Sequence, residues 1–343
     1  KRIMAYTTIN KSTDYFNTKL YTGNSSTQAL TGIGFQPDFV WTKPRVTGGH
    51  FLSDSIRGGT KIVQSADTGA ESTRSNHIQS FDSDGFTLGA DGTSNNNGDA
   101  TVAWNWKAGT TSGINTTGAD ITPSSYSMNA TSGISIIKFT GNGVDGAKIA
   151  HGLGAVPELI ISKRLENSNY WAVYHKLDVT DYLVLNTDAA YSDAPLWKDT
   201  VPTSVYYTVD ASTSVNATDT LVAYCFKSVP GYSKIGSYTG NGNADGTFVY
   251  TGFKPAFVMV KRSSGAQGWV IWDNKRPGYN LTNQSLTANE NGAEETGRTF
   301  DMLSNGFKIR DTNTATNYSG STYIYMAFGQ SLVGSNGVTA KAR

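Results

Sequence analysis

Glycines at one point of the sequence fit a cofactor-binding pattern. Gly141, Gly143 and Gly146 match the G-x-G-x-x-G phrase of dinucleotide-binding loops, which needs a helix directly after the loop to receive the pyrophosphate. The residues that follow, AKIAHGLGAVP, contain two glycines and a proline, which disfavour a helix. The pattern therefore predicts a glycine-rich turn and no bound cofactor.

A second short phrase, Asp82-Ser83-Asp84-Gly85, resembles the opening of a calcium-binding loop. No glutamate completes the twelve-residue calcium pattern, and a related phrase near the C-terminus has Leu303 and Asn305 in place of the aspartates. Asp-Gly and Asn-Gly are typical of tight hairpin turns. We expect a hairpin here, with a calcium ion as the alternative.

Other chemistry-bearing residues lack the neighbours that catalysis or metal binding requires. The histidines show no i, i+4 pair and no nearby cysteine, so no zinc site is predicted; they are His50, His77, His151 and His175. Cys225 lies in the apolar run VAYCF without a cationic neighbour, which predicts a buried, unreactive thiol. Because no acid stands in a distinctive local context either, we expect no enzymatic activity.

Aspartate and arginine recur together at the end of two apolar runs. Asp54 and Arg57 stand in DSIR, and Asp273 and Arg276 stand in DNKR. An ion pair that braces a turn is the simplest interpretation of this spacing.

Aromatic residues beside polar loops give the remaining functional signal. Sugar rings stack on aromatic faces while neighbouring amides bind their hydroxyl groups. The candidates for a glycan-binding surface are Trp171, Trp197, Tyr206, Tyr207, Trp269 and Trp272. The alternative is that these side chains belong to the core or to interfaces.

The elements that would carry these residues form an internal repeat. One phrase recurs as YTGN from Tyr21, FTGN from Phe139 and YTGN from Tyr238, at steps of 118 and 99 residues. Each copy is followed at fixed offsets by a proline, two apolar residues and a lysine, and each ends in a similar phrase: TVAWNWK, LVAYCFK or YMAFG. A repeat of about 100 residues points to one module used several times.

The repeated phrases are short runs of Val, Ile, Phe, Tyr and Thr between turn residues, which is typical of β-strands. They predict an all-β protein of three tandem antiparallel β-sandwiches of about 100 residues each, with one large barrel as the alternative. The expected parts are an N-terminal arm at 1–17, sandwiches at 18–108, 133–228 and 229–329, a Ser/Thr/Gly-rich linker at 109–132, and a tail at 330–343.

The composition excludes several partner classes. The formal net charge is +1, charged residues make up 16% of the chain, and lysine and arginine form no run, so nucleic acid and membrane insertion are not expected. A single cysteine allows no internal disulfide, and the start KRIMAYTT lacks the apolar core of a signal peptide. We expect release by a route other than ordinary secretion.

The phrases themselves resemble a known family. YTGN…GFxPxFVxxK, SDGFxLG and VAWxWKAG are similar to repeats of tail-fibre-like, host-recognition virion proteins of marine and cyanobacterial tailed phages. The start from Met4 to Asn24 looks like the beginning of those proteins as well. The second copy departs from the pattern because it lacks the SDGF phrase.

The resemblance implies a structural protein with lectin-like sandwiches on the external surface of a virion, on tail or capsid. We expect it to contact other virion proteins and to form a homotrimer. The leading hypothesis is a tail-fibre or appendage component that binds a host-surface glycan. The alternatives are a capsid decoration or other architectural protein, and a glycan-degrading tail enzyme. Attachment to the virion would use the N-terminal arm, with Tyr6, Tyr15 and Phe16 as its aromatic residues.

Overall fold

The computed structural model describes residues 7–331, and the predicted all-β class is confirmed in this range. Its strands pair antiparallel with their neighbours. The helical segments among these residues are η1 (Ser12–Asp14) and α1 (Thr314–Asn317).

Large sheets with a common strand order form the framework of the described chain. The sheet of unit 1 (residues 16–106) runs β1 (Phe16–Thr22), β9 (Ala100–Trp106), β3 (Phe39–Pro44), β4 (Phe51–Asp54), β5 (Lys61–Gln64), β6 (Ser72–Thr73). That of unit 2 (residues 125–226) runs β10 (Ser125–Asn129), β11 (Ile134–Thr140), β18 (Thr220–Phe226), β13 (Leu159–Arg164), β14 (Ala172–His175), β15 (Asp178–Val184), β16 (Ser192–Asp193). That of unit 3 (residues 233–330) runs β19 (Ser233–Thr239), β26 (Thr322–Gln330), β21 (Lys254–Arg262), β22 (Val270–Asp273), β23 (Leu286–Thr287).

A small sheet packs on the outer face of each large one. In unit 1 it comprises β2 (Gln28–Leu30), β8 (Gly85–Leu88) and β7 (Ile78–Asp82). In unit 3 it comprises β20 (Phe248–Tyr250), β25 (Gly306–Ile309) and β24 (Phe300–Leu303). Unit 2, which lacks the SDGF phrase, has only β12 (Ala147–Ala150) and β17 (Tyr206–Val209) in this place within the described chain.

The central strands are buried on both faces, and their side chains alternate between two cores. In β3, Phe39 and Trp41 face a core that residues of all the units share, while Val40 faces the small sheet of its own unit. In β21, Phe257 and Val258 divide in the same way. Successive side chains of a strand point to opposite faces, so the uninterrupted apolar runs reflect burial on both sides.

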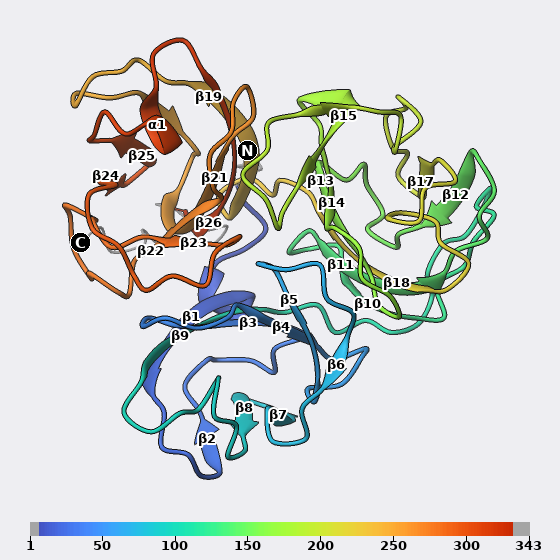
Figure 1. The fold of residues 1–343 in the computed structure, drawn as a ribbon, viewed down its shortest axis with the longest axis horizontal. Coiled ribbons are helices and arrows are strands. Elements are labelled where there is room, and N and C mark those ends of the chain that lie inside the picture. Colours follow the sequence, from blue (N-terminus) through green and yellow to red (C-terminus); the bar gives the residue numbers. More distant parts are fainter. Residues whose placement is uncertain (1–6, 332–343) are drawn as a thin grey trace, which may run out of the picture.

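The shared core makes the units parts of one ring. Figure 1 shows them as lobes around a common centre, and the large sheets supply the residues that meet there. Phe16 and Trp106 of unit 1 lie within 5.7 Å (ring centroids) of Phe328 of unit 3, which also contacts Phe226 of unit 2 at 6.1 Å. The sandwiches are therefore not independent domains on a string.

The lysine of each repeat crosses from one unit to the next. Lys43 Nζ donates to Gly292 O of unit 3 at 2.8 Å, Lys163 Nζ to Thr68 O of unit 1 at 3.1 Å, and Lys261 Nζ to Asp188 O of unit 2 at 3.2 Å. Burial lowers the pKa of Lys43 and Lys163 to about 8 and that of Lys261 to about 7. The conserved offset of this lysine in the repeat thus corresponds to an interface contact.

The YTGN and FTGN phrases fix the outer end of each unit. The backbone N–H groups of Asn24, Asn142 and Asn241 donate to the side-chain oxygens of Asn95, Asn216 and Asn317, each at 2.9 Å. The preceding glycine is required because a Cβ atom at Gly23, Gly141 or Gly240 would lie 2.1, 2.0 or 2.4 Å from a backbone oxygen. The repeat phrase therefore encodes a structural clamp.

Parts of the predicted arm and linker belong to the sheets. Phe16 begins β1, so the arm ends in the framework of unit 1. The predicted linker 109–132 contains β10, which pairs with β11 along its whole length. This segment is held to unit 2 and is not a free spacer.

Candidate functional site

Most of the aromatic side chains predicted to bind glycan are buried, which corrects that prediction. Trp171, Trp197, Tyr207, Trp269 and Trp272 are each at most 2% exposed. A ring without an accessible face cannot stack on a sugar at the surface. Tyr206 is half-buried, and the Lys148 ammonium lies 5.4 Å from the centre of its ring.

The buried tryptophans have structural roles instead. Trp171 Nε1 of unit 2 donates to Gln64 O of unit 1 at 2.9 Å, and Trp269 Nε1 of unit 3 donates to Val184 O of unit 2 at 3.0 Å. Trp197 packs in the sandwich core of unit 2, and Trp272 in that of unit 3. Trp171 and Trp269 directly precede β14 and β22, and Trp272 lies within β22, so these side chains enter the cores together with the apolar residues of those strands.

The proposed attachment residues do not form an exposed patch either. Phe16 is 2% exposed and packs against Trp106 and Phe328 in the shared core, so it cannot dock on another protein. Tyr15 is half-buried against Tyr232. Tyr6 lies outside the described residues.

The residues set aside as structural in the sequence are buried or hydrogen-bonded. Cys225 is fully buried, and burial raises the pKa of its thiol. His151 is also buried, and its Nε2 lies 3.1 Å from Thr203 O. Gly141–Gly146 form the loop between β11 and β12, with no helix after it. No cluster of three or more potential metal-ligating side chains occurs within residues 7–331.

The predicted hairpin turn and the ion pairs are confirmed. Asp84 lies between β7 and β8, where it accepts hydrogen bonds from Gly32 N at 2.9 Å and Gly34 N at 2.6 Å, and these bonds hold the pKa of its carboxyl below the usual range. Arg57 Nε lies 2.6 Å from Asp54 Oδ2. Arg276 Nε lies 2.7 Å from Asp273 Oδ2.

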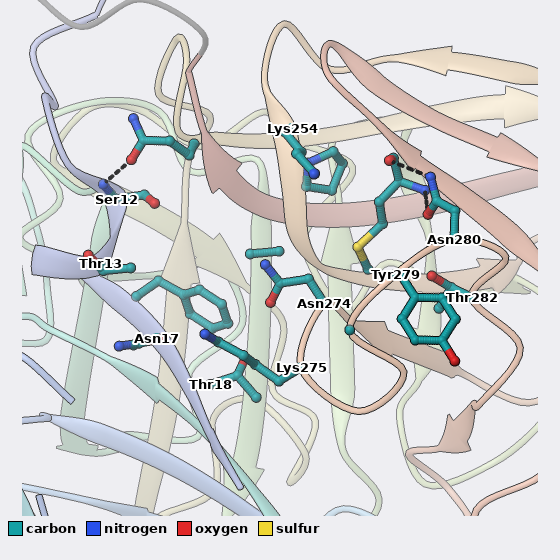
Figure 2. A pocket seen from close by; sticks show the side chains of 16 residues that line it. Ser12, Thr13, Asn17, Thr18, Lys254, Asn274, Lys275, Tyr279, Asn280 and Thr282 are labelled. Atoms are coloured by element: carbon teal, nitrogen blue, oxygen red, sulfur yellow. Dashed lines mark hydrogen bonds between the residues drawn. The ribbon is translucent and has the colours of Figure 1, made fainter. Parts of the chain in front are cut away.

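An open cleft of about 780 Å³ lies where unit 3 meets the N-terminal segment of unit 1. One wall is the segment from Ser12 to Thr18, and the other is the loop 274–285 between β22 and β23 (Figure 2). The start of β21 forms part of the lining through Lys254, Pro255 and Ala256. A cleft of this volume is in the range that holds small-molecule ligands.

The loop 274–285 is held at both ends. Asp273, before the loop, accepts hydrogen bonds from the backbone N–H groups of Lys275 at 2.9 Å and Arg276 at 3.0 Å. Near the middle of the loop Asn280 forms reciprocal hydrogen bonds of 3.0 Å with the backbone of Met302, drawn in Figure 2, and at the far end Ser285 N donates to Glu295 O at 2.9 Å. Although burial alone would raise the pKa of Asp273, Arg276 holds it below the usual range, so the anchoring carboxylate stays charged.

The tip of this loop presents an aromatic ring. Gly278 has φ of +76°, a conformation that glycine adopts at low cost, and the next residue, Tyr279, is 81% exposed. Figure 2 shows Tyr279 on the side of the cleft opposite Ser12 and Thr13. Both held ends limit the freedom of the segment that carries this ring.

The opposite wall is fixed to the end of the last large-sheet strand. Ser12 N donates to Gln330 Oε1 at 2.7 Å, which ties the N-terminal segment to β26. Phe16 reaches the cleft from the shared core, and Asn17 donates from Nδ2 to Ile33 O at 2.9 Å. The cleft thus exists only because the first and last strands meet.

The lining combines apolar surface with polar groups and carries positive charge. It contains Lys254 and Lys275 together with amides and hydroxyls, and the described residues that line it include no aspartate or glutamate. Ammonium groups donate to carboxylates and hydroxyls, and amides both donate and accept. The arrangement can bind a ligand rich in hydroxyl or carboxylate oxygens.

Sequence reasoning missed this cleft and Tyr279. A signal was present, because the loop 274–285 is longer than its counterparts 55–60 and 176–177 and contains the turn dipeptide Pro277-Gly278 before the tyrosine. An aromatic residue after a turn, outside any apolar alternation, is a better candidate for exposure than one within a strand.

No helix within residues 7–331 is long and apolar enough to cross a membrane.

Comparison with known proteins gives a family but no described activity. No curated protein and no solved structure matches the chain. One family model matches residues 11–331, a span that includes all the large sheets. The chain therefore belongs to the family described as a domain of unknown function, DUF7483.

Proposed function

We propose that this chain is a structural protein of a phage virion, in a tail fibre or appendage, and that it binds a glycan on the host surface. The cleft between units 3 and 1 is the observation that carries the binding role. It combines an exposed aromatic ring, amides and hydroxyls on two walls, which is the chemistry that saccharide recognition uses. The virion setting rests on the similarity of the repeat phrases to tail-fibre-like phage proteins.

In this proposal the buried tryptophans do not contact the ligand. Trp171 and Trp269 join neighbouring units, and the loop 274–285 contacts the ligand. Binding without cleavage is proposed because the described lining offers no pair of carboxylates for glycoside hydrolysis.

Immunogold electron microscopy of intact particles tests the virion assignment. Antibody raised against the folded chain should place gold on tails or their fibres. Gold spread over heads would instead support capsid decoration. Unlabelled particles would contradict a virion role, provided that the antibody binds the native chain in solution.

Adhesion to cells tests the recognition role. Fluorescently labelled chain should bind saturably to cells of the host bacterium, and prior removal of surface polysaccharide should abolish the signal. Undiminished binding to cells stripped of polysaccharide would exclude a glycan receptor.

A further inference from the structure

The place that the cleft occupies in unit 3 has an equivalent in the other units. We call it the corner: the turn after β4, β14 or β22, beside the start of the central strand β3, β13 or β21. The residue after β4, β14 or β22 donates its backbone N–H to a residue at or just before the central strand of the same sheet. These bonds join Ser55 to Asp38 at 2.8 Å, Lys176 to Glu158 at 2.9 Å, and Asn274 to Ala256 at 2.9 Å. The corners of the units can therefore be compared residue by residue.

In units 1 and 2 this position holds an acid that other parts of the chain satisfy. Asp38 accepts from Ser55 Oγ at 2.8 Å, Ser127 Oγ at 2.9 Å and Ala108 N at 2.9 Å. Glu158 accepts from Lys176 Nζ at 2.9 Å and also from Ser228 Oγ. Some of these donors lie on segments that lead into the next unit, so the carboxylate joins the two units.

Unit 3 has the opposite charge pattern at this corner. Ala256 replaces the acid, and Lys275 stands where Ile56 and Leu177 follow the equivalent backbone bond in units 1 and 2. A hollow of about 600 Å³ at the corner of unit 1 is lined by Asp38, whereas the cleft of unit 3 is lined by Lys275 and by no described acid. This corner therefore offers a lysine ammonium but lacks the carboxylate that units 1 and 2 supply.

We infer that the cleft of unit 3 binds a saccharide that carries a carboxylate group, such as a uronic acid. This inference rests on the proposed function and names the ligand class of the same site. The ligand carboxylate lies near Ala256 and accepts a hydrogen bond from the Lys275 ammonium. In Figure 2 Lys275 extends from its loop toward the segment with Asn17 and Thr18, where it can meet a ligand held between the walls.

The other lining groups suit the remainder of such a ligand. Asn274 and Asn17 offer amides to sugar hydroxyls, and Tyr279 offers a ring face at the outer edge of the cleft. A carboxylate adds a charge-assisted hydrogen bond with lysine that a neutral sugar cannot form. The cleft should therefore prefer an acidic saccharide to a neutral one of the same length.

Titration calorimetry on the full chain tests the inference with α-1,4-linked trigalacturonate, and with α-1,4-linked galactotriose as the neutral probe of the same configuration and linkage. Trigalacturonate should bind at least about tenfold more tightly than galactotriose. Ala256→Asp restores the acid of the other corners, so it should weaken trigalacturonate binding by at least about tenfold while leaving the fold intact. Lys275→Ala should weaken it as well.

Two variants serve as matched controls. Ala256→Asn has nearly the size of the aspartate variant without its charge, and it should bind trigalacturonate better than Ala256→Asp does. Lys176→Ala removes a lysine from the corner of unit 2 and should leave binding unchanged. Near-ultraviolet circular dichroism identical to that of the wild type would show that each variant is folded.

The outcomes separate the ligand class from the wider function. No binding of trigalacturonate at millimolar concentration, equal binding of galactotriose, or equal binding by Ala256→Asp would overturn the inference. If labelled wild-type chain still adheres to host cells in that case, host recognition stands and only the acidic-saccharide site is wrong. If adhesion is also absent, the proposed function itself fails.

Discussion

Unit 1 meets each neighbour at a buried aspartate that belongs to an ion pair within one unit, whereas units 2 and 3 meet at a histidine and a methionine. Asp54, Asp273 and His175 are equivalent, because each pairs with the first apolar residue of a central strand: Phe39, Phe257 or Leu159. The side chains that face them from the next unit are Tyr224, Trp104 and Met326, which also occupy one register position.

The bonding at this position follows the residue types. Tyr224 donates to Asp54 Oδ2 at 2.8 Å, and Trp104 Nε1 donates to Asp273 Oδ2 at 3.1 Å. His175 and Met326 instead line a void of about 10 Å³, and His175 Nε2 has no hydrogen-bond partner among the described residues. The same backbone frame therefore accepts either an aspartate that is hydrogen-bonded across the interface or a histidine in van der Waals contact with methionine.

The residue types at these interfaces can change as long as each buried charge keeps its partner from the neighbouring unit. A buried charge without its partner is costly, while a neutral histidine beside a methionine is accommodated at the same place. The lysine contacts recur at all these interfaces and do not share this variation.

The largest effect should come from breaking one ion pair. Arg276→Ala leaves Asp273 charged and buried, since both side chains are 0% exposed, and should lower the free energy of unfolding by about 3–5 kcal/mol. Guanidinium chloride unfolding followed by tryptophan fluorescence measures this loss. As a control, Arg298→Ala removes an arginine 18% exposed, paired with Glu295, and should cost at most about 1 kcal/mol. Equal losses for the two variants would contradict the role assigned to burial.

The apolar interface should fail by a different mechanism. Met326→Ala enlarges the void between units 2 and 3 and should cost roughly 2–5 kcal/mol, because buried contacts are lost without full collapse of the cavity. Met326→Leu keeps most of the volume and should cost less than about 1.5 kcal/mol. The same unfolding experiment compares the two variants, and a leucine variant as unstable as the alanine one would show that volume is not the decisive property.

Acid should weaken the histidine interface before the ion pairs. Burial lowers the pKa of His175 to about 3, below its value in the unfolded chain, so the unfolded state binds more protons as the pH falls below about 6.5. Its contribution to stability is therefore present above pH 6.5 and is lost toward pH 3, with a loss of about 2 kcal/mol at pH 5.

Comparing His175→Asn with the wild type isolates this contribution, because the other buried histidines titrate in both proteins. Burial also lowers the pKa of His77 and His151, each to about 4. The difference in unfolding free energy between wild type and variant should shrink from pH 7 to pH 5. A difference that stays constant over this range would show that His175 does not titrate with folding.

The smallest effect should come from the tryptophan hydrogen bonds between units. Trp171→Phe removes the donor to Gln64 O, and Trp269→Phe removes the donor to Val184 O. Each should cost about 1 kcal/mol beyond the change in ring size, since one buried hydrogen bond is lost. Trp272→Phe, whose indole donates within unit 3 to Arg298 O, gives the reference for a contact inside one unit. The unit-spanning variants should also increase hydrogen exchange of β5 or β15, and the reference variant should not.

Several features of the fold could be predicted from the sequence. The Val, Phe, Tyr and Thr runs between turn residues indicated strands, and the recurrence of YTGN and of a lysine at fixed offsets indicated a repeated module. The ion pairs at Asp54 and Asp273 followed from spacing alone, because residues three apart in a turn are always close. The burial of the aromatics could not be predicted. Trp171 and Trp269 lie just outside strands and are covered by neighbouring units, and strands buried on both faces show no alternation that separates inside from outside.

By itself the sequence determined the β-module, its turns and the contacts between residues near one another in the chain, since these depend on local spacing and side-chain type. The tertiary structure alone decided that the units close into a ring around a shared core, which turns Trp171 and Trp269 into interface residues. It also decided where the cleft lies, because Asn17 and Lys275 line it from opposite ends of the chain. Local patterns carry no information about which distant surfaces meet, and in this protein that meeting creates the candidate site.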